Sequence, residues 1–414
     1  MTKLLIQGHH SLRGEVELSG DQQTIMAIQA ASLLSTHGTV IIDNVPATAN
    51  VVAMNQLLQS LNVVIEFDRH QQILKMDATR HIEPVKISGQ ELLAAGAILA
   101  RCRHVQLVDN GVNPEYQQTM IRIGEFLSQM GATMTTANEM IDITADHLVG
   151  QKIDLQNDTL TTTLALMMAA TMAQGITVLN NPYDHPAVIE LAKVLNKMGA
   201  RVHGAGTRVL RIQGVTFLHS TDYYALDDQE EASVYLIIGA LTAGDVLVRG
   251  ARQVHLQPLI DHLEQMGNTV IIQRNGIRVI GTRLQLPVDI QPEISRFTGS
   301  YTQIALLALQ MVAQGTSTIS NFSKSELDIL GCAVADQHGQ LKYGGRQLVI
   351  HGPLKQYPTV VTTNSPITGL LALLDALVAN HVTTINPAEV AGGSFVHLID
   401  RLIELGAKIE LSFE

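Results

Sequence analysis

One pattern repeats six times along the chain, and it constrains the fold more than any other feature of the sequence. A short β-rich run ends in Asn or Gly about every 70 residues, and these runs end at Asn44, Asn110, Asn180, Gly250, Asn321 and Asn386. A second marker, the residue between a helix and the next strand, recurs with a similar period, at Asn62, Gly131, Gly199, Gly267, Gly339 and Gly406. Two independent markers with one period predict six copies of a single structural unit.

Each unit combines an apolar helix with an amphipathic one, in the order strand, apolar helix, strand, amphipathic helix and closing hairpin. The amphipathic helix of the first unit places one set of side chains on a single face: Val51, Met54, Leu57, Leu58 and Leu61. The apolar helices, such as TLALMMAATMA in the third unit, are apolar on nearly every side and must be buried on every side. We therefore predict an α/β fold of two inside-out barrels, prism-like in form, each of three βαβαββ units with the sheets outside the helices.

The composition limits the class of protein and its partners. Apolar residues make up 46% of the 414 residues and charged residues 16%, which excludes disorder and indicates packed globular domains. The net charge of −11 argues against nucleic acid and against an anionic membrane surface as partners. The apolar runs are too short to cross a bilayer, and the N-terminal residues lack the pattern of a signal peptide. We therefore expect no membrane insertion and a cytoplasmic location.

The reactive side chains show no pattern typical of a metal or nucleophile site. Cys102 and Cys332 are too few and too far apart for a disulfide framework. Cys102 follows a predicted helix, where we expect a buried, unreactive thiol. The 16 histidines include no HExxH or comparable spacing, so we expect no metal and no cofactor.

Several stretches together resemble the enolpyruvyl transferase family. They are RGEVELSG at residues 13–20, MVAQGTSTISNF at 311–322, HLIDRLIELGAKIE at 397–410 and, most clearly, residues 161–215. Within the family the chain is most similar to the branch that acts on UDP-N-acetylglucosamine at the start of peptidoglycan synthesis. The Gly-Asn-Ala-Gly-Thr motif of the shikimate-pathway branch is missing. The resemblance implies an EPSP-synthase-like fold, with one domain at residues 21–228 and a second formed by residues 1–20 and 229–414.

The resemblance also implies which residues would line a substrate cleft. The family joins phosphoenolpyruvate to a UDP-sugar, and two anionic substrates require fixed cations, a general acid and a base. The family positions fall here on Gln22, Gln23, Gly89, Asn113, Gln118, Asn157, Thr159, Asp228, Glu231, Tyr301, Ser325, Ser365, Ile367 and Gly393. Gln22, Asn113 and Tyr301 stand where the family has a lysine, its general-acid cysteine and its base aspartate. The ionisable groups that remain are the carboxylates of Asp228 and Glu231.

The starts of the six apolar helices lead to the same expectation without reference to the family. The stretches GDQQ, SGQE, NDTL, DDQEE, GSYTQ and NSPI contain no lysine or arginine. Asp228, and Ser365 followed by Pro366, have the pattern of helix N-caps, which stabilise a helix start without binding phosphate. Glu115 and Asp228 are the carboxylic acids that could still transfer a proton, although a solvated loop acid is the simpler interpretation of Glu115. We expect no catalytic residue at the family positions.

Three functional hypotheses follow from these replacements. The one that we favour is a catalytically defective paralogue that keeps the fold as a binding or regulatory module in peptidoglycan precursor metabolism. Its partner would be a UDP-sugar or a catalytically competent paralogue. The second is an active enolpyruvyl transferase with a rearranged site that uses Glu115 or Asp228, and the third is a non-enzymatic interaction scaffold.

Overall fold

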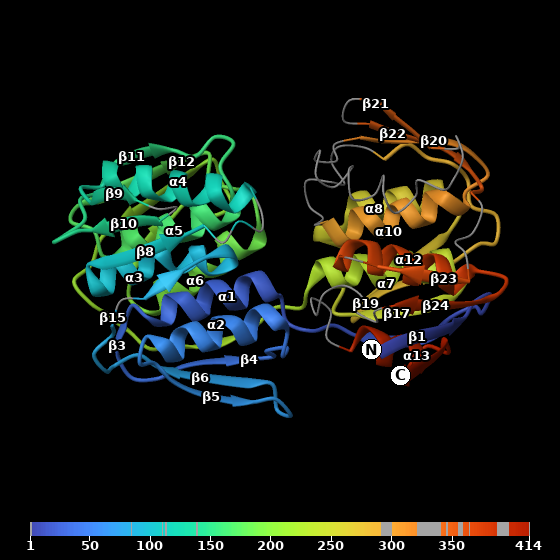
Figure 1. Cartoon of the computed structure of the whole chain (residues 1–414), viewed down its shortest axis with the longest axis horizontal. Coiled ribbons are helices and arrows are strands. Elements are labelled where there is room, and N and C mark those ends of the chain that lie inside the picture. Colours follow the sequence, from blue (N-terminus) through green and yellow to red (C-terminus); the bar gives the residue numbers. More distant parts are fainter. Residues whose placement is uncertain are drawn as a thin grey trace. The chain divides into compact units, whose positions relative to one another are not determined.

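In the computed structural model the chain forms two compact units (Figure 1). One unit is Gly20–Leu226, and the other combines Met1–Ser19 with Asp227–Glu414. The structure describes residues 2–83, 85–109, 111, 114–137, 140–290, 300–320, 341–344, 347–354, 359–363, 365–386 and 397–413.

The unit Gly20–Leu226 contains three four-stranded sheets, and in two of them all four strands come from one repeat. The strands of the first sheet are, in order, β16 (Asp222–Tyr224), β4 (Val40–Asp43), β6 (Ile73–Asp77) and β5 (Val64–Asp68). Those of the second are β7 (Lys86–Ile87), β8 (His104–Val108), β10 (Met140–Thr144) and β9 (Thr133–Ala137). Those of the third are β11 (Lys152–Asp154), β12 (Ile176–Asn180), β14 (Val209–Gln213) and β13 (Arg201–His203). A short pair joins β3 (Ser35–His37) to β15 (Leu218–His219). The helices are α1 (Gln22–Ser32), α2 (Ala49–Ser60), the 3₁₀ helix η1 (Gly89–Ala94), α3 (Ala95–Cys102), α4 (Pro114–Gln129), α5 (Leu160–Thr171) and α6 (Pro186–Lys197).

The other unit repeats this plan. One sheet has, in order, the strands β18 (Thr269–Gln273), β19 (Gly276–Ile280), β17 (Asp245–Arg249) and β2 (Arg13–Glu17). Another has β20 (Gly315–Ser320), β22 (Gln347–Gly352) and β21 (Leu341–Gly344). The third has β23 (Val360–Thr362), β24 (Val382–Asn386), β1 (Thr2–Gln7) and β25 (Lys408–Phe413). Its helices are α7 (Gln229–Leu241), α8 (Gln253–Gln265), α10 (Ser300–Val312), α12 (Pro366–Val378) and α13 (Leu398–Glu404). The six β-rich runs predicted from the repeat are strands β4, β8, β12, β17, β20 and β24, so that prediction is confirmed.

The apolar helices lie inside each unit and the sheets lie outside, as predicted (Figure 1). In α5, every residue from Thr162 to Thr171 is buried. Each Leu or Met side chain removed from water in this way contributes about 1.5–3 kcal/mol. The contact between α3 and α5 is close enough that a Cβ on Gly96 would lie 1.8 Å from the carbonyl oxygen of Ala165.

One apolar helix differs from the prediction of a continuous α-helix. The stretch ELLAAGAILA begins as the 3₁₀ helix η1 and becomes α-helical at Ala95. Gly89, the first residue of η1, has φ +57°, which a regular α-helical turn does not adopt. The tighter 3₁₀ turn therefore carries the chain from this bend into α3.

Two strands lie in a different unit from the helix that follows them in sequence. Strand β2 precedes α1, yet it pairs in parallel with β17, with Val16 opposite Val248. Strand β16 precedes α7, yet it pairs in parallel with β4, with Tyr223 opposite Ile42. Each unit therefore takes one strand from a segment far in sequence from the other strands of that sheet, and the chain passes between units at two places.

Candidate functional site

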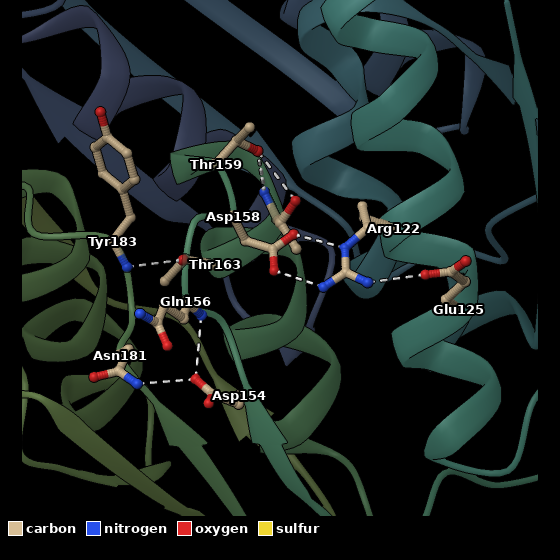
Figure 2. Close-up of polar contacts among 10 residues, drawn as sticks. Arg122, Glu125, Asp154, Gln156, Asp158, Thr159, Thr163, Asn181 and Tyr183 are labelled. Carbon is tan, nitrogen blue, oxygen red and sulfur yellow. Dashed lines mark hydrogen bonds and ion pairs between the residues drawn. The ribbon is translucent and has the colours of Figure 1, made fainter.

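The site is built where two parallel strands of the third repeat end. Strands β11 and β12 pair with Asp154 opposite Asn180, and α5 and α6 begin a few residues beyond their carboxyl ends. The two loops that follow are bonded to each other. Asn181 donates from Nδ2 to the Asp154 carboxylate at 2.9 Å, and the Tyr183 N–H donates to Thr163 Oγ1 at 3.1 Å (Figure 2). These bonds hold the start of α5 beside the loop that leads to α6.

The start of α5 has the polar character of an anion site. Thr159 is the N-cap, and its hydroxyl oxygen accepts a hydrogen bond from the Thr162 N–H at 3.2 Å. Asn157, two residues earlier, has φ +67°, a left-handed conformation that Asn tolerates better than most residues. The first N–H groups of a helix have no partner within it and carry partial positive charge. Negative charge near Thr159 is therefore favoured.

A cation from another helix reaches this position. Arg122 on α4 donates from Nε and Nη2 to the two carboxylate oxygens of Asp158, at 3.1 and 2.9 Å (Figure 2). Its Nη1 donates to Glu125 at 3.0 Å, and its guanidinium carbon lies 4.3 Å from the centroid of the Phe126 ring. The hydrogen bonds to Asp158 raise the pKa of Arg122, so the guanidinium remains charged. The sequence at the start of α5 gave no indication of this arginine.

Two hollows flank the Asp158 loop. One has a volume of about 560 Å³ and is lined by Gln118, Thr119, Arg122, Gln156, Asn157, Asp158, Thr159 and Thr162. The other has a volume of about 470 Å³ and is lined by Leu155, Gln156, Asn157, Asp158, Asn181, Pro182, Tyr183 and Arg208. They share three residues, and we call the two together the α5 groove.

The charges that line the α5 groove are few. They are Arg122, Arg208 and Asp158, and the remaining polar lining residues are amides, hydroxyls and the Tyr183 phenol. The Asp158 side chain is only 5% exposed, whereas Arg122 is 37% exposed. Because Asp158 takes two donors of Arg122, much of the positive charge at the helix start is already neutralised. The groove suits a polar ligand of low charge better than a polyanion.

The structure brings three of the sequence-predicted residues together in the α5 groove. Gln118 comes from α4, Asn157 lies in the loop before α5, and Thr159 caps α5. Asn113 lies outside the described residues. Glu115 belongs to α4, but its side chain also lies outside what the structure describes.

Gln22, Gln23 and Gly89 lie at other helix starts of the same unit. Asp21 caps α1 by accepting the Thr24 N–H at 2.8 Å, and Gln22 follows it with 8% of its surface exposed. Gln22 Oε1 accepts no hydrogen bond from any residue that the structure describes, and Gln23 is half-buried. Gly89 opens η1 behind a capping box formed by Ser88 and Glu91. These two helix starts have caps, but their family positions carry no charged side chain.

The carboxylates predicted in the other unit have structural roles. Asp228 is the N-cap of α7, as predicted, and accepts the N–H groups of Glu230 and Glu231 at 2.8 and 3.0 Å. Glu231 is 1% exposed, forms an ion pair with Arg401 on α13 and accepts the Ser19 N–H at 2.7 Å. Burial raises the pKa of Glu231, against the lowering effect of Arg401 and Ser19. Both carboxylates are engaged in holding the start of α7.

The last predicted positions are also structural where they are described. The Tyr301 N–H donates to Glu230 Oε1 at 3.0 Å. Ser365 caps α12 in a capping box with Thr368, with Pro366 as the first helical residue, which confirms the predicted cap. Ile367 packs against the apolar core of its unit. Ser325 and Gly393 lie outside the described residues.

Sequence reasoning missed Arg122 and Arg401, which, among the residues that the structure describes, pair with carboxylates at helix starts. Arg122 is 36 residues from Asp158, and Arg401 is 170 residues from Glu231. The available signal was weak, because Arg122 and Glu125 have the spacing of an ordinary surface pair on an exposed helix face.

The described residues offer no sign of metal or thiol chemistry. They contain no group of three or more His, Cys, Asp or Glu side chains placed to hold a metal ion. Cys102 is a free, half-buried thiol at the end of α3, and burial raises its pKa to about 11. None of the helices in the described stretches is long and apolar enough to span a membrane.

Comparison with known proteins defines the class. The family model for EPSP synthase (3-phosphoshikimate 1-carboxyvinyltransferase) matches residues 6–402. The chain therefore belongs to the enolpyruvyl transferase family, which agrees with the resemblance seen in the sequence. It is 33% identical to UDP-N-acetylglucosamine 1-carboxyvinyltransferase 1 of Halalkalibacterium halodurans, over 99% of this chain and 94% of that protein.

Solved structures of the same family share the fold. The enolpyruvyl transferase NikO from Streptomyces tendae superposes with a TM-score of 0.84 at 21% identity and covers 99% of both chains. EPSP synthase from Acinetobacter baumannii gives a TM-score of 0.80 at 17% identity over the whole of both chains. The two inside-out α/β units are thus the architecture of this family.

Proposed function

We propose that this chain is a catalytically defective UDP-N-acetylglucosamine 1-carboxyvinyltransferase-like protein that binds a UDP-sugar without turning it over. It would act as a binding or regulatory module in peptidoglycan precursor metabolism. The observation that carries the proposal is the charge at the described helix starts of Gly20–Leu226. At and near these helix starts the family positions carry Gln22, Gly89, Gln118 and Asn157, none of which is a cation. Arg122 is paired with Asp158 and Glu125.

The chemistry explains why these replacements matter. Phosphoenolpyruvate carries a carboxylate and a phosphate, and its transfer needs several cations together with a general acid for the enol carbon. Loss of one general acid costs about 10²–10⁴ in rate, and loss of one electrostatic donor costs about 10²–10³. Glu231 and Asp228 offer little compensation, because the first is paired with Arg401 and the second caps α7. Several such losses together would reduce turnover to a negligible rate.

The first experiment measures turnover. Purified full-length protein is mixed with phosphoenolpyruvate and UDP-N-acetylglucosamine, and released phosphate is measured. The relative from Halalkalibacterium halodurans serves as the positive control. We expect no release above the protein-free blank under conditions in which the relative is active. Phosphate release within about a hundredfold of the relative's rate contradicts the proposal and supports an active enzyme with a rearranged site.

The second experiment measures binding by thermal shift with UDP-N-acetylglucosamine. A ligand that binds only the folded chain stabilises it by RT ln(1 + [L]/Kd), which is about 1.4 kcal/mol at ten times Kd. We expect a concentration-dependent rise in Tm. The absence of any shift at millimolar ligand contradicts the binding proposal and supports the interaction scaffold instead.

A further inference from the structure

Asp158 occupies the place on Arg122 where a ligand anion would bind. Its two carboxylate oxygens accept from Arg122 Nε and Nη2 at 3.1 and 2.9 Å, in the bidentate arrangement that guanidinium forms with phosphate as well as with carboxylate (Figure 2). Asp158 directly precedes the N-cap Thr159, so it also lies in the positive field of the α5 start. The guanidinium is thus paired with a carboxylate of the chain itself, and the charge of that carboxylate also offsets the positive field of the helix start.

We propose that Asp158 is a specificity-determining residue that makes the α5 groove insensitive to the phosphate charge of its ligand. The inference rests on the proposed function for the identity of the ligand, a UDP-sugar. A phosphate that approached Arg122 would have to displace a carboxylate that is 5% exposed and already makes two hydrogen bonds. The exchange replaces one charge-assisted pair by another and gains little. The groove would therefore take the uncharged part of a nucleotide sugar, and its diphosphate would gain almost nothing from Arg122.

Glu125 provides a matched control on the same guanidinium. It accepts from Arg122 Nη1 at 3.0 Å, its side chain is 48% exposed, and it is not among the residues that line the α5 groove. The substitution E125Q removes the same unit of charge as D158N but leaves the Asp158–Arg122 pair in place. Only D158N should expose Arg122 to a ligand in the groove.

The decisive experiment is calorimetric titration of inorganic pyrophosphate into the full-length protein at low ionic strength. Wild type should bind with a Kd above about 1 mM, D158N should bind at least about tenfold more tightly, and E125Q should stay within about threefold of wild type. The double variant D158N/R122Q should return to the wild-type level, which excludes Arg208 as the source of the gain. D158S serves as a second variant if D158N does not fold.

Several results would overturn the proposal. One is tight pyrophosphate binding by wild type, with a Kd below about 0.1 mM, and another is a folded D158N protein with unchanged affinity. A third is a gain in E125Q as large as that in D158N. The pyrophosphate titration needs neither turnover nor a UDP-sugar, so its outcome is separate from that of the two experiments on function. If UDP-N-acetylglucosamine does bind, its affinity for wild type should lie within about tenfold of that of uridine.

Discussion

Arg401 is the partner of an almost completely buried carboxylate, and its replacement by methionine should strongly destabilise the unit that contains it. Glu231 is 1% exposed, whereas the Arg401 side chain is 15% exposed. Glu231 also accepts the Ser19 N–H at 2.7 Å, and Arg401 Nη2 donates to Ser19 Oγ at 3.1 Å. The three residues join the end of the N-terminal segment, the start of α7 and helix α13. In R401M the carboxylate would remain buried without Arg401, with Ser19 as its hydrogen-bond donor.

The size of the effect follows from this burial. Removing one partner of a buried ion pair costs about 3–5 kcal/mol, because the other charge is left without compensation. For a cooperative unit of about 200 residues, 1 kcal/mol shifts Tm by about 2–4 °C, so R401M should lower Tm by about 6–20 °C. Replacing Glu231 as well, in E231Q/R401M, should recover at least half of the loss because no buried charge remains.

Urea unfolding at pH 7 measures the free energy of unfolding, and the same unit offers a control. Arg249 and Glu15 form an ion pair between β17 and β2, but their side chains are 41% and 51% exposed. R249M should therefore cost less than about 1 kcal/mol. If R401M and R249M cost the same, the reasoning about the buried pair is wrong.

The pH dependence gives a second check on R401M. Burial already raises the pKa of Glu231 in the wild type, and losing Arg401 removes the main opposing effect and raises it further. A carboxyl whose pKa is raised in the fold destabilises the protein increasingly as the pH rises above its unfolded pKa of about 4.3, and the effect disappears below that pH, where the group is protonated in both states. The stability difference between wild type and R401M should therefore shrink as the pH falls from 7 to 5. A difference that stays constant or grows over that range contradicts this account.

Three further predictions concern packing, pH and thiol reactivity. G96A should cost at least about 2 kcal/mol, because its Cβ would lie 1.8 Å from the Ala165 carbonyl oxygen. In G124A the closest contact would be the flexible Met134 side chain, with its sulfur at 2.8 Å, so that variant should stay within about 1 kcal/mol of wild type in urea unfolding. Burial lowers the pKa of His262 to about 4. The free energy of unfolding should therefore fall by about 3 kcal/mol as the pH falls from about 6.5 toward 4, because the buried imidazole must then take up a proton. In H262Q, urea unfolding at a series of pH values should show a smaller fall over this range. The pKa of Cys102 is about 11, so little of it is thiolate at pH 8. In a C332S variant, iodoacetamide should alkylate Cys102 about a hundredfold more slowly than an exposed cysteine. A rate within threefold of that of the exposed cysteine would show that the thiol is accessible and ionised.

The sequence predicted the repeating unit because its signals are local. A helix that is apolar on every side, such as α5, can only be buried, and a strand that ends in Asn or Gly at a constant period marks each unit. The caps at Asp228 and Ser365 were predicted for the same reason, since an N-cap bonds to N–H groups two or three residues away. Among the apolar helices of the described stretches, the 3₁₀ start at Gly89 was not predicted, because it depends on the backbone angle of that one residue.

Only the tertiary structure shows which residues far apart in sequence pair with one another, both between strands and between charged side chains. The repeat alone does not specify which sheet takes β2 or β16, because several repeats offer a parallel edge to such a strand. Only the resemblance to the family implied that residues 1–20 join residues 229–414. The charge of the α5 groove was equally hidden, since Arg122 comes from α4 and lies 36 residues from Asp158. From the sequence alone, the chain has a family fold whose helix starts lack cations. The fold then brings Arg122 from α4 to the third of those starts, where it pairs with Asp158. The physical reason is that a carboxylate buried beside a helix start is stabilised by a cation, and only the packing of α4 against α5 places one there.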